Sequence, residues 1–284
     1  SYVQRYIYKE IFMETEPISL DIYLESTKTI EKYFMKQESL QDILNLFSFW
    51  DKDIFSYIKL YRETSEEIVS PLLATNTHSL YLSALKLTIS GQSSSVYPIL
   101  RVSYENAVYA LMIHNNIELA EIWTNRHKDE ESYKKNITAF SPAIKKLRKR
   151  LEEYDEKSND TKYAEHILGL YDAVIDFGSH PNPKTIQNNS EIYLKNHNLV
   201  QRFEYLSNFT SEMTRTISAC LDYGIAISVI LSLKDINNEN FSLDKKFLKL
   251  FKQINNSIDS LIGESLEVKD KYYQKYNKSK ERNE

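Results

Sequence analysis

Two charged residues, Arg101 and Glu105, interrupt a stretch of the chain that is otherwise mostly apolar. Residues four apart share one face of a helix, so this guanidinium and this carboxylate are placed to form an ion pair. The neighbouring Val102, Val108 and Leu111 indicate a largely buried helix, and a buried charge without a partner is costly. The pair is therefore either a structural clamp between helices or part of a functional pocket.

His180 is the histidine that we single out as a candidate for chemistry. It follows a predicted helix end at Gly178, in a loop that two prolines keep from being helical. Carbonyl groups at a helix end favour a cationic imidazole, which suits a capping role, whereas an imidazole beside Arg101 would serve as a general acid or base. Both interpretations stay open, with Arg101, Glu105 and His180 as the candidate catalytic residues.

No metal or cofactor is predicted. His127 precedes Asp129 and Glu130, but no cysteine, second histidine or regular helical spacing completes a set of metal ligands there. The chain has no glycine-rich phosphate loop and no Gly-x-Ser-x-Gly or His-Glu-x-x-His motif. The remaining histidines are isolated in the sequence and are interpreted as surface or capping residues: His78, His114, His166 and His197.

The strongest basic run follows Ser141-Pro142, a pair that predicts a helix start with proline in the first turn. The run consists of five side chains: Lys145, Lys146, Arg148, Lys149 and Arg150. Because Glu152 and Glu153 come next, we favour a solvated outer face over a nucleic-acid site.

Composition predicts an all-α protein, a multi-helix bundle with long central helices. Only 5 Gly and 6 Pro occur in 284 residues, too few for the many turns of a β-rich fold. The formal net charge of -4 excludes a strongly cationic nucleic-acid binder and leaves room only for a local basic patch. A lone cysteine, Cys220, in an apolar stretch is expected to be a buried hydrophobe of a cytoplasmic protein.

Helical spacing and capping residues predict the elements that must position these side chains. Ser19, Thr77 and Asn198 are expected N-caps, Gly91 is expected to end a helix in the left-handed conformation, and Asn115 with the next residue is expected to break one. The apolar run at 219–233 is too short for a membrane span and indicates a core helix. The predicted helices are 2–14, 19–34, 39–49, 51–70, 78–90, 93–114, 117–126, 142–154, 163–177, 198–234 and one from 242.

We expect these helices to form one domain over residues 1–284. A separate N-terminal helical subdomain over 1–70 is an alternative, and the charged segment 268–284 is expected to fray. The start of the chain carries charge in an amphipathic pattern, which is not typical of a signal peptide.

The stretch 78–127 resembles a family of uncharacterised bacterial helical proteins. The shared features begin with a Leu-rich helix, the Ser90-Gly91 break and the Leu-Arg-x-x-x-Glu pattern at 100–105. A helix end at Trp123, Arg126 and His127 follows, and a Ser-His-Pro turn comes later, at 179–181. This pattern is also similar to HEPN-like helical domains, many of which are ribonucleases of defence or toxin systems. The resemblance implies a helical fold and adds ligand-binding candidates, so that the set is Arg101, Glu105, Trp123, Arg126 and His127.

One feature of those ribonucleases is missing. They carry an Arg followed by a His after four to six intervening residues, and no Arg in this chain has a His at that spacing.

Three functions of different classes remain. The first is a protein-interaction or self-association module, with a homodimer or a protein partner. The second is a divergent HEPN-like ribonuclease that uses Arg101, Glu105 and His180 on nucleic acid. The third is a small-molecule or nucleotide sensor whose pocket lies between helices.

Overall fold

The computed structural model describes residues 11–13, 18–37, 40–158, 163–174, 190–195, 198–207 and 211–235. The chain divides into two units, Ser1–Phe241 and Ser242–Glu284, and every described residue belongs to the first. The predicted helix from 242 and the predicted fraying of 268–284 lie outside the described residues.

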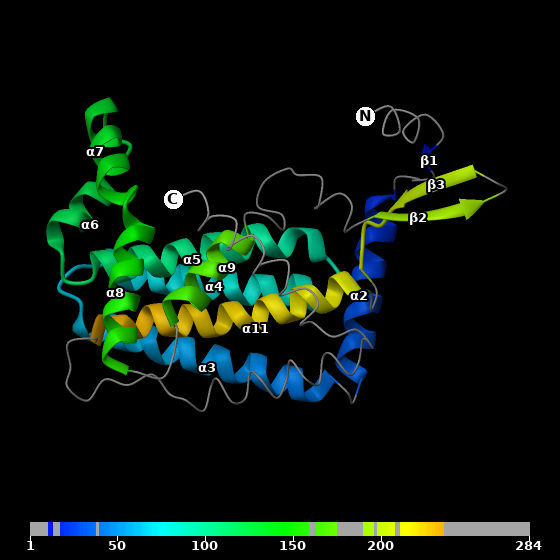
Figure 1. Ribbon diagram of the computed structural model, residues 1–284, viewed down its shortest axis with the longest axis horizontal. Helices are drawn as coiled ribbons and strands as arrows, with labels where there is room; N and C mark the ends of the chain where they lie inside the picture. The colour runs from blue at the N-terminus through cyan, green and yellow to red at the C-terminus, as the bar shows by residue number, and fades with distance from the viewer. Residues whose placement is uncertain are drawn as a thin grey trace. The chain divides into compact units, whose positions relative to one another are not determined.

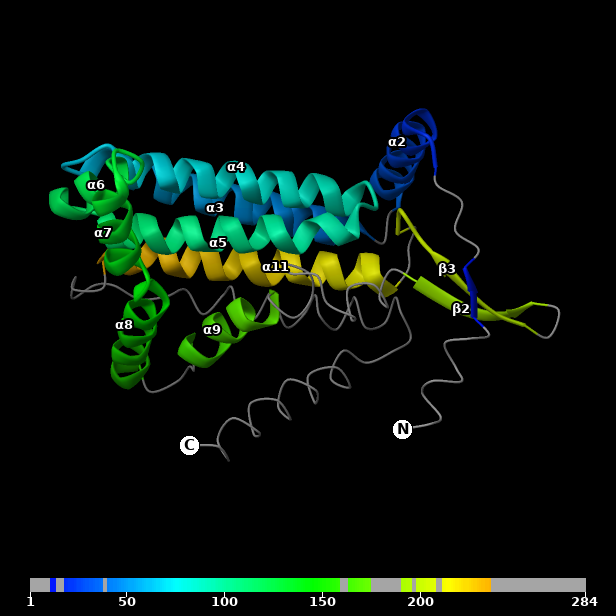
Figure 2. The same cartoon turned by 90° about the horizontal axis from the view of Figure 1, so that it is seen from above.

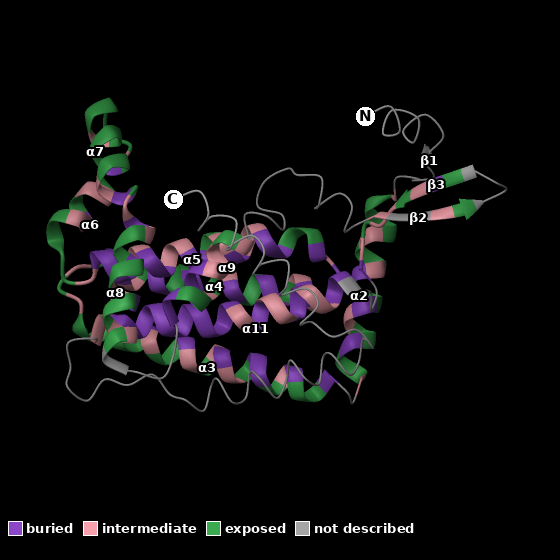
Figure 3. Ribbon diagram, viewed as in Figure 1, coloured by how far each residue is buried: buried purple, intermediate pink, exposed green. Residues whose placement is uncertain are grey.

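Four long helices run side by side and form the core of the first unit (Figures 1 and 2). They are α3 (Gln41–Thr64), α4 (Val69–Ile89), α5 (Val96–Ile113) and α11 (Ser211–Ser232). Figure 3 shows that their buried faces turn towards one another. The largest fully buried side chains include Trp50, Tyr61, Tyr81, Tyr104 and Leu100. The predicted all-α bundle with long central helices is confirmed.

Helix α11 packs closely enough on its neighbours to require glycine at position 224. A Cβ atom there would come within 2.7 Å of both the Trp50 ring on α3 and the Tyr81 hydroxyl on α4. The carbonyl oxygen of Cys220, one turn before Gly224 on α11, accepts a hydrogen bond of 3.0 Å from the Tyr81 hydroxyl. The thiol of Cys220 is fully buried, and that burial raises its pKa to about 12. Cys220 is therefore an inert core residue, as predicted.

In the described part of the chain, one helical segment is long and apolar enough to cross a membrane, Glu212–Asp235. Most of its apolar window, 83%, is buried inside the bundle, which is also what the core helix of a soluble protein shows.

In the part of the chain that the structure describes, five shorter helices pack around the bundle: α2 (Leu20–Lys36), α6 (Ile117–Thr124), α7 (Glu130–Phe140), α8 (Ala143–Ser158) and α9 (Tyr163–Val174). Helix α8 contacts both α5 and α9, and α6 contacts α4, α5 and α7. The carboxylate of Asp155, near the end of α8, accepts hydrogen bonds of 2.9 Å from the backbone N–H groups of Tyr163 and Ala164. This carboxylate satisfies two of the free donors at the start of α9 and so fixes α9 beside α8.

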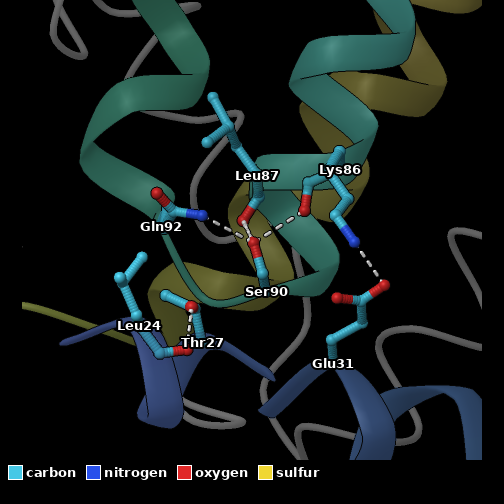
Figure 4. A network of polar contacts seen from close by, with 7 residues as sticks. All are labelled: Leu24, Thr27, Glu31, Lys86, Leu87, Ser90 and Gln92. Carbon is cyan, nitrogen blue, oxygen red and sulfur yellow. Dashed lines mark hydrogen bonds and ion pairs between the residues drawn. The ribbon is translucent and has the colours of Figure 1, made fainter. Parts of the chain in front are cut away.

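Helix α2 is capped as predicted and is held against the end of α4. The hydroxyl of Ser19 accepts a hydrogen bond of 3.3 Å from the backbone N–H of Ile22. Figure 4 shows the ion pair between Glu31 of α2 and Lys86 of α4. Next to it the Ser90 hydroxyl donates to two carbonyl groups at the end of α4 and accepts from the Gln92 side chain at 2.8 Å.

Gly91 ends α4 in the left-handed conformation, with a φ angle of 79°. A Cβ atom there would lie 2.5 Å from the carbonyl oxygen of Ser207, whose N–H donates to the Gly91 carbonyl at 2.7 Å. Glycine is required for both reasons, and its prediction as a helix stop is confirmed.

A three-stranded sheet corrects part of two predicted helices: 11–13 of the helix predicted at 2–14 and 198–203 of the helix predicted at 198–234 are strands. The rest of 2–14 lies outside the described residues. Strand β3 (Asn198–Phe203) lies between β2 (Ser190–Lys195), which is antiparallel to it, and β1 (Ile11–Met13), which is parallel. Asn198 therefore begins a strand, and the long helix starts at 211. Helical spacing within 198–203 was misleading because strand formation depends on pairing with β2, which is near in the sequence, and with β1, which is far away, and apolar spacing records neither.

Two predicted helix boundaries in the bundle were also wrong. Helix α3 runs without a break through 49–53, because Trp50 and Ile54 continue its buried stripe. The helix predicted at 51–70 does not run to 70: α3 ends at Thr64, and Pro71 lies in the first turn of α4, where its missing N–H costs nothing. Thr77 is consequently mid-helix, and its hydroxyl donates to the carbonyl oxygen of Leu73 at 3.0 Å.

Candidate functional site

Helices α6 and α8 meet α5 at the end of the bundle opposite the sheet (Figures 1 and 2). Side chains of these three helices line a groove. Its volume is about 370 Å³. Ten side chains line it: Val108, Leu111, Met112, Asn116, Leu119, Lys146, Leu147, Lys149, Arg150 and Glu153.

The floor of the groove is apolar and belongs to the packed structure. Val108, Leu111 and Met112 come from one face of α5 and are buried, and Leu147 of α8 is buried opposite them. Leu119 of α6 is half-buried and closes one wall. These spacings of three and four residues are the ones that give a helix a continuous apolar stripe.

The turn between α5 and α6 brings the wall into place. Asn115 has a φ angle of 56°, a left-handed conformation that asparagine tolerates better than most residues. Asn116 then caps α6, its side-chain oxygen accepting from the backbone N–H of Leu119 at 3.0 Å. The predicted break at this pair of asparagines is confirmed, and it is what turns α6 back over the end of α5.

The rim of the groove on α8 is basic. Lys146, Lys149 and Arg150 face it, against the single carboxylate of Glu153, which lies 3.8 Å from the amine of Lys149 in an exposed pair. Among the described residues no ion pair engages Lys146 or Arg150. The basic run is thus divided: three of its side chains line an apolar groove, while Lys145 and Arg148 are exposed outside it.

The Arg101–Glu105 ion pair forms as predicted, with 3.0 Å between Nε and Oε1. Its place differs from the prediction, because these side chains are 22% and 34% exposed rather than buried at the centre. Helix α5 is amphipathic at this point. Leu100 and Tyr104 point into the core, and Arg101 and Glu105 lie on the face that is partly exposed to solvent.

Tyr171 of α9 completes the pair, and sequence reasoning missed it. Its hydroxyl donates to Glu105 Oε1 at 3.2 Å, and its ring lies 5.9 Å from the Arg101 guanidinium carbon. Burial and the charge of Glu105 raise the pKa of Tyr171, so that it stays protonated and donates. The three side chains hold α9 against α5, which is what a structural clamp does. No signal in the sequence around 171 identifies α5 as its neighbour.

His180 lies outside the described residues. The assembly of Arg101, Glu105 and His180 as a catalytic site therefore stays a prediction.

The other ligand-binding candidates lie on a different pair of elements. Trp123 is half-buried near the end of α6, and His127 is exposed in the turn before α7. The Arg126 guanidinium carbon lies 5.5 Å from the ring centre of Tyr133 on α7, and its Nε atom is buried without a hydrogen-bond partner. Arg126 thus connects α6 to α7 through a cation–π contact.

Within the residues that the structure describes, no group of three or more His, Cys, Asp or Glu side chains is arranged to hold a metal ion.

His114, interpreted from the sequence as isolated, is part of a hydrogen-bonded network beside the groove wall. Its Nδ1 atom lies 2.9 Å from the Ser65 hydroxyl, which lies 3.0 Å from the Ser70 hydroxyl. Ser70 in turn donates to the carboxylate of Glu67. On the other side of the ring, Nε2 lies 3.3 Å from the side-chain amide nitrogen of Asn115. Two segments far apart in the sequence, 65–70 and 114–115, supply this network, which explains why spacing did not reveal it.

No family model, no curated protein and no solved structure matches this chain. The resemblance to HEPN-like helical domains stays a prediction.

Proposed function

We propose that the protein is a protein-interaction module that binds an acidic segment of a partner protein in the groove formed by α5, α6 and α8. The observation that carries the proposal is the combination of an apolar floor with three cations on one rim. Apolar side chains of the partner would fill the floor, and its carboxylates would pair with Lys146, Lys149 and Arg150.

The size of the groove supports side-chain anchors rather than an enclosed helix. A volume of about 370 Å³ is near the lower end of the range of roughly 300 to 1,000 Å³ found for binding pockets. A small number of anchors in such a pocket supplies most of the affinity in many protein interfaces. The exposed cations around them raise the association rate and select for negative charge.

The ribonuclease alternative has less support. Its candidate Arg101 and Glu105 are engaged with each other and with Tyr171. A small-molecule or nucleotide sensor would use the same groove, and binding of a short anionic ligand in preference to a peptide would favour it. Self-association stays a prediction.

A direct test uses two fluorescent peptides with the same Leu and Phe anchors, one flanked by glutamates and the other by lysines. We expect fluorescence anisotropy to show binding of the acidic peptide only. The triple variant K146E/K149E/R150E should lose this binding by about 100-fold or more, since it replaces attraction by repulsion at three positions. Circular dichroism and thermal unfolding should show that the variant is folded.

The matched control reverses two cations of the same helix that lie outside the groove. K145E/R148E makes two charge reversals on α8 where the triple variant makes three, and it should keep the acidic peptide within about threefold of the wild-type affinity. Equal losses in the two variants would mean that net charge, not the groove, attracts the peptide, and would overturn the proposal.

A further inference from the structure

We propose that protonation of His114 weakens binding in the groove, because neutral His114 accepts the hydrogen bond that holds Asn115 and the start of α6 in place. This inference names the regulation of the groove and rests on its proposed function.

The hydrogen bonds around His114 determine which ring nitrogen carries the proton. Ser70 uses its only hydroxyl proton to donate to Glu67, so Ser65 must donate to Ser70. Ser65 then has no proton left, and His114 Nδ1–H must donate to Ser65. The neutral imidazole is thereby fixed with a free lone pair on Nε2.

Asn115 is oriented to meet that lone pair. Its side-chain oxygen accepts from the backbone N–H of Glu66 at 3.1 Å, which places its amide nitrogen toward His114 Nε2 at 3.3 Å. An imidazolium has a proton on Nε2, so two donors would then face each other. Asn115 cannot turn its oxygen to the ring without losing its bond to Glu66.

Asn115 controls the groove through its neighbour. Asn116, the next residue, both lines the groove and caps α6. Asn115 itself has a left-handed backbone, which the two side-chain bonds help to maintain. When one bond is replaced by repulsion, the α5–α6 turn loosens and the wall that carries Leu119 loses its fixed position.

Four charged groups act on His114, and with burial of the ring they keep it neutral near pH 7. Its pKa is lowered by burial first and then by the charge of Lys234, with a smaller contribution from Arg150 on α8. Glu67, before α4, and Asp235, beside Lys234, act in the opposite direction. The ring of Tyr61 on α3 lies against the imidazole at a tilt of 57°, with 4.9 Å between ring centres. The switch therefore operates on the acid side of the ordinary histidine pKa of about 6.5.

One electrostatic effect opposes this mechanism. An acidic peptide that neutralises Arg150 would favour the imidazolium and would bind more tightly in acid. Arg150 is the smallest of the four charge effects on His114, so the hydrogen bond to Asn115 is expected to dominate. The loss of the hydrogen bond predicts weaker peptide binding in acid, whereas the effect of Arg150 predicts tighter binding.

The test measures the acidic peptide at about pH 7.5 and about pH 5.5, where glutamates stay ionised. We expect the wild-type affinity to fall by about threefold to tenfold in acid, the equivalent of one hydrogen bond. His114→Asn keeps a donor for Ser65 but cannot titrate, and its affinity should not change over this range. His78→Asn removes a histidine that pairs with Asp51 on α3 and should keep the wild-type pH dependence.

Asn115→Asp is the most specific variant, because aspartate tolerates the left-handed backbone and prefers an imidazolium beside it. Its pH dependence should be reversed, with tighter binding in acid. Wild-type binding that is unchanged or tighter in acid, or an N115D variant with the wild-type sign, would overturn the proposal.

A measurement on the free protein separates this inference from the proposed function. Amide hydrogen exchange of Leu119 and Ala120, corrected for intrinsic rates, should show α6 less protected at the lower pH in the wild type but not in His114→Asn. If the peptide fails to bind at either pH while this difference in protection appears, the proposed function is wrong and the switch is supported. Equal protection at both pH values contradicts the switch.

Discussion

Two charged regions lie along α5: the Arg101–Glu105 pair on the helix itself, and the basic rim of α8 beside the groove. The protein uses their charges differently. Arg101 and Glu105 bind each other and Tyr171, so their charge is satisfied by the protein itself. Lys146 and Arg150 have no carboxylate partner among the described residues and stand beside apolar surface. Charge that is paired within a fold holds elements together, whereas unpaired charge around an apolar groove is available to another molecule.

The largest effect on stability is expected from the first region. Glu105→Ala removes a partner from the half-buried Arg101 and from Tyr171, and should lower the free energy of unfolding by about 1 to 2 kcal/mol. Glu153→Ala in the groove should change it by less than about 0.5 kcal/mol, because the Lys149–Glu153 pair is exposed. Urea unfolding measures both, and equal effects would erase the distinction between the regions.

Tyr171→Phe isolates one bond of the same region. The variant keeps the ring under Arg101 and loses the hydroxyl that donates to Glu105, and the expected cost is about 0.5 to 1.5 kcal/mol. Affinity for the acidic peptide should stay at the wild-type value. A loss of peptide binding in this variant would show that the clamp and the groove are not independent.

Salt should affect the second region more than the first. Raising the ionic strength from about 0.05 to about 0.5 M shortens the screening length several-fold, so the acidic peptide should bind about threefold to tenfold more weakly. The Arg101–Glu105 pair is partly shielded from solvent, and the stability difference between wild type and Glu105→Ala should change little over this range. Titrations at several salt concentrations would reveal the contrast.

The smallest effect concerns pH and stability. Because burial and Lys234 lower the pKa of His114 in the folded protein, the unfolded chain binds the proton more readily. The stability contributed by neutral His114 is complete above its unfolded pKa of about 6.5 and is lost as the pH falls below that value. Unfolding of His114→Asn compared with wild type between about pH 7.5 and pH 5.5 should show this difference, and a wild type that gains stability in acid relative to the variant would contradict it.

Sequence reasoning found part of each region. The i, i+4 spacing of Arg101 and Glu105 predicted their ion pair, since both residues belong to one helix. It did not predict Tyr171, because the contact of α9 with α5 joins residues 66 positions apart. The basic run of α8 was recognised, but its division into groove and outer face depends on where α5 and α6 lie.

The sequence by itself determined what depends on neighbours along the chain. The cap at Ser19, the left-handed stop at Gly91 and the break at Asn115 are short-range hydrogen bonds or backbone preferences, and they set the helices of an all-α protein. Only the tertiary structure decided the pairing of β3 with the distant strand β1, the groove and the network at His114. Each of these joins segments that the linear pattern leaves unrelated, and their contact comes from packing that no local periodicity records.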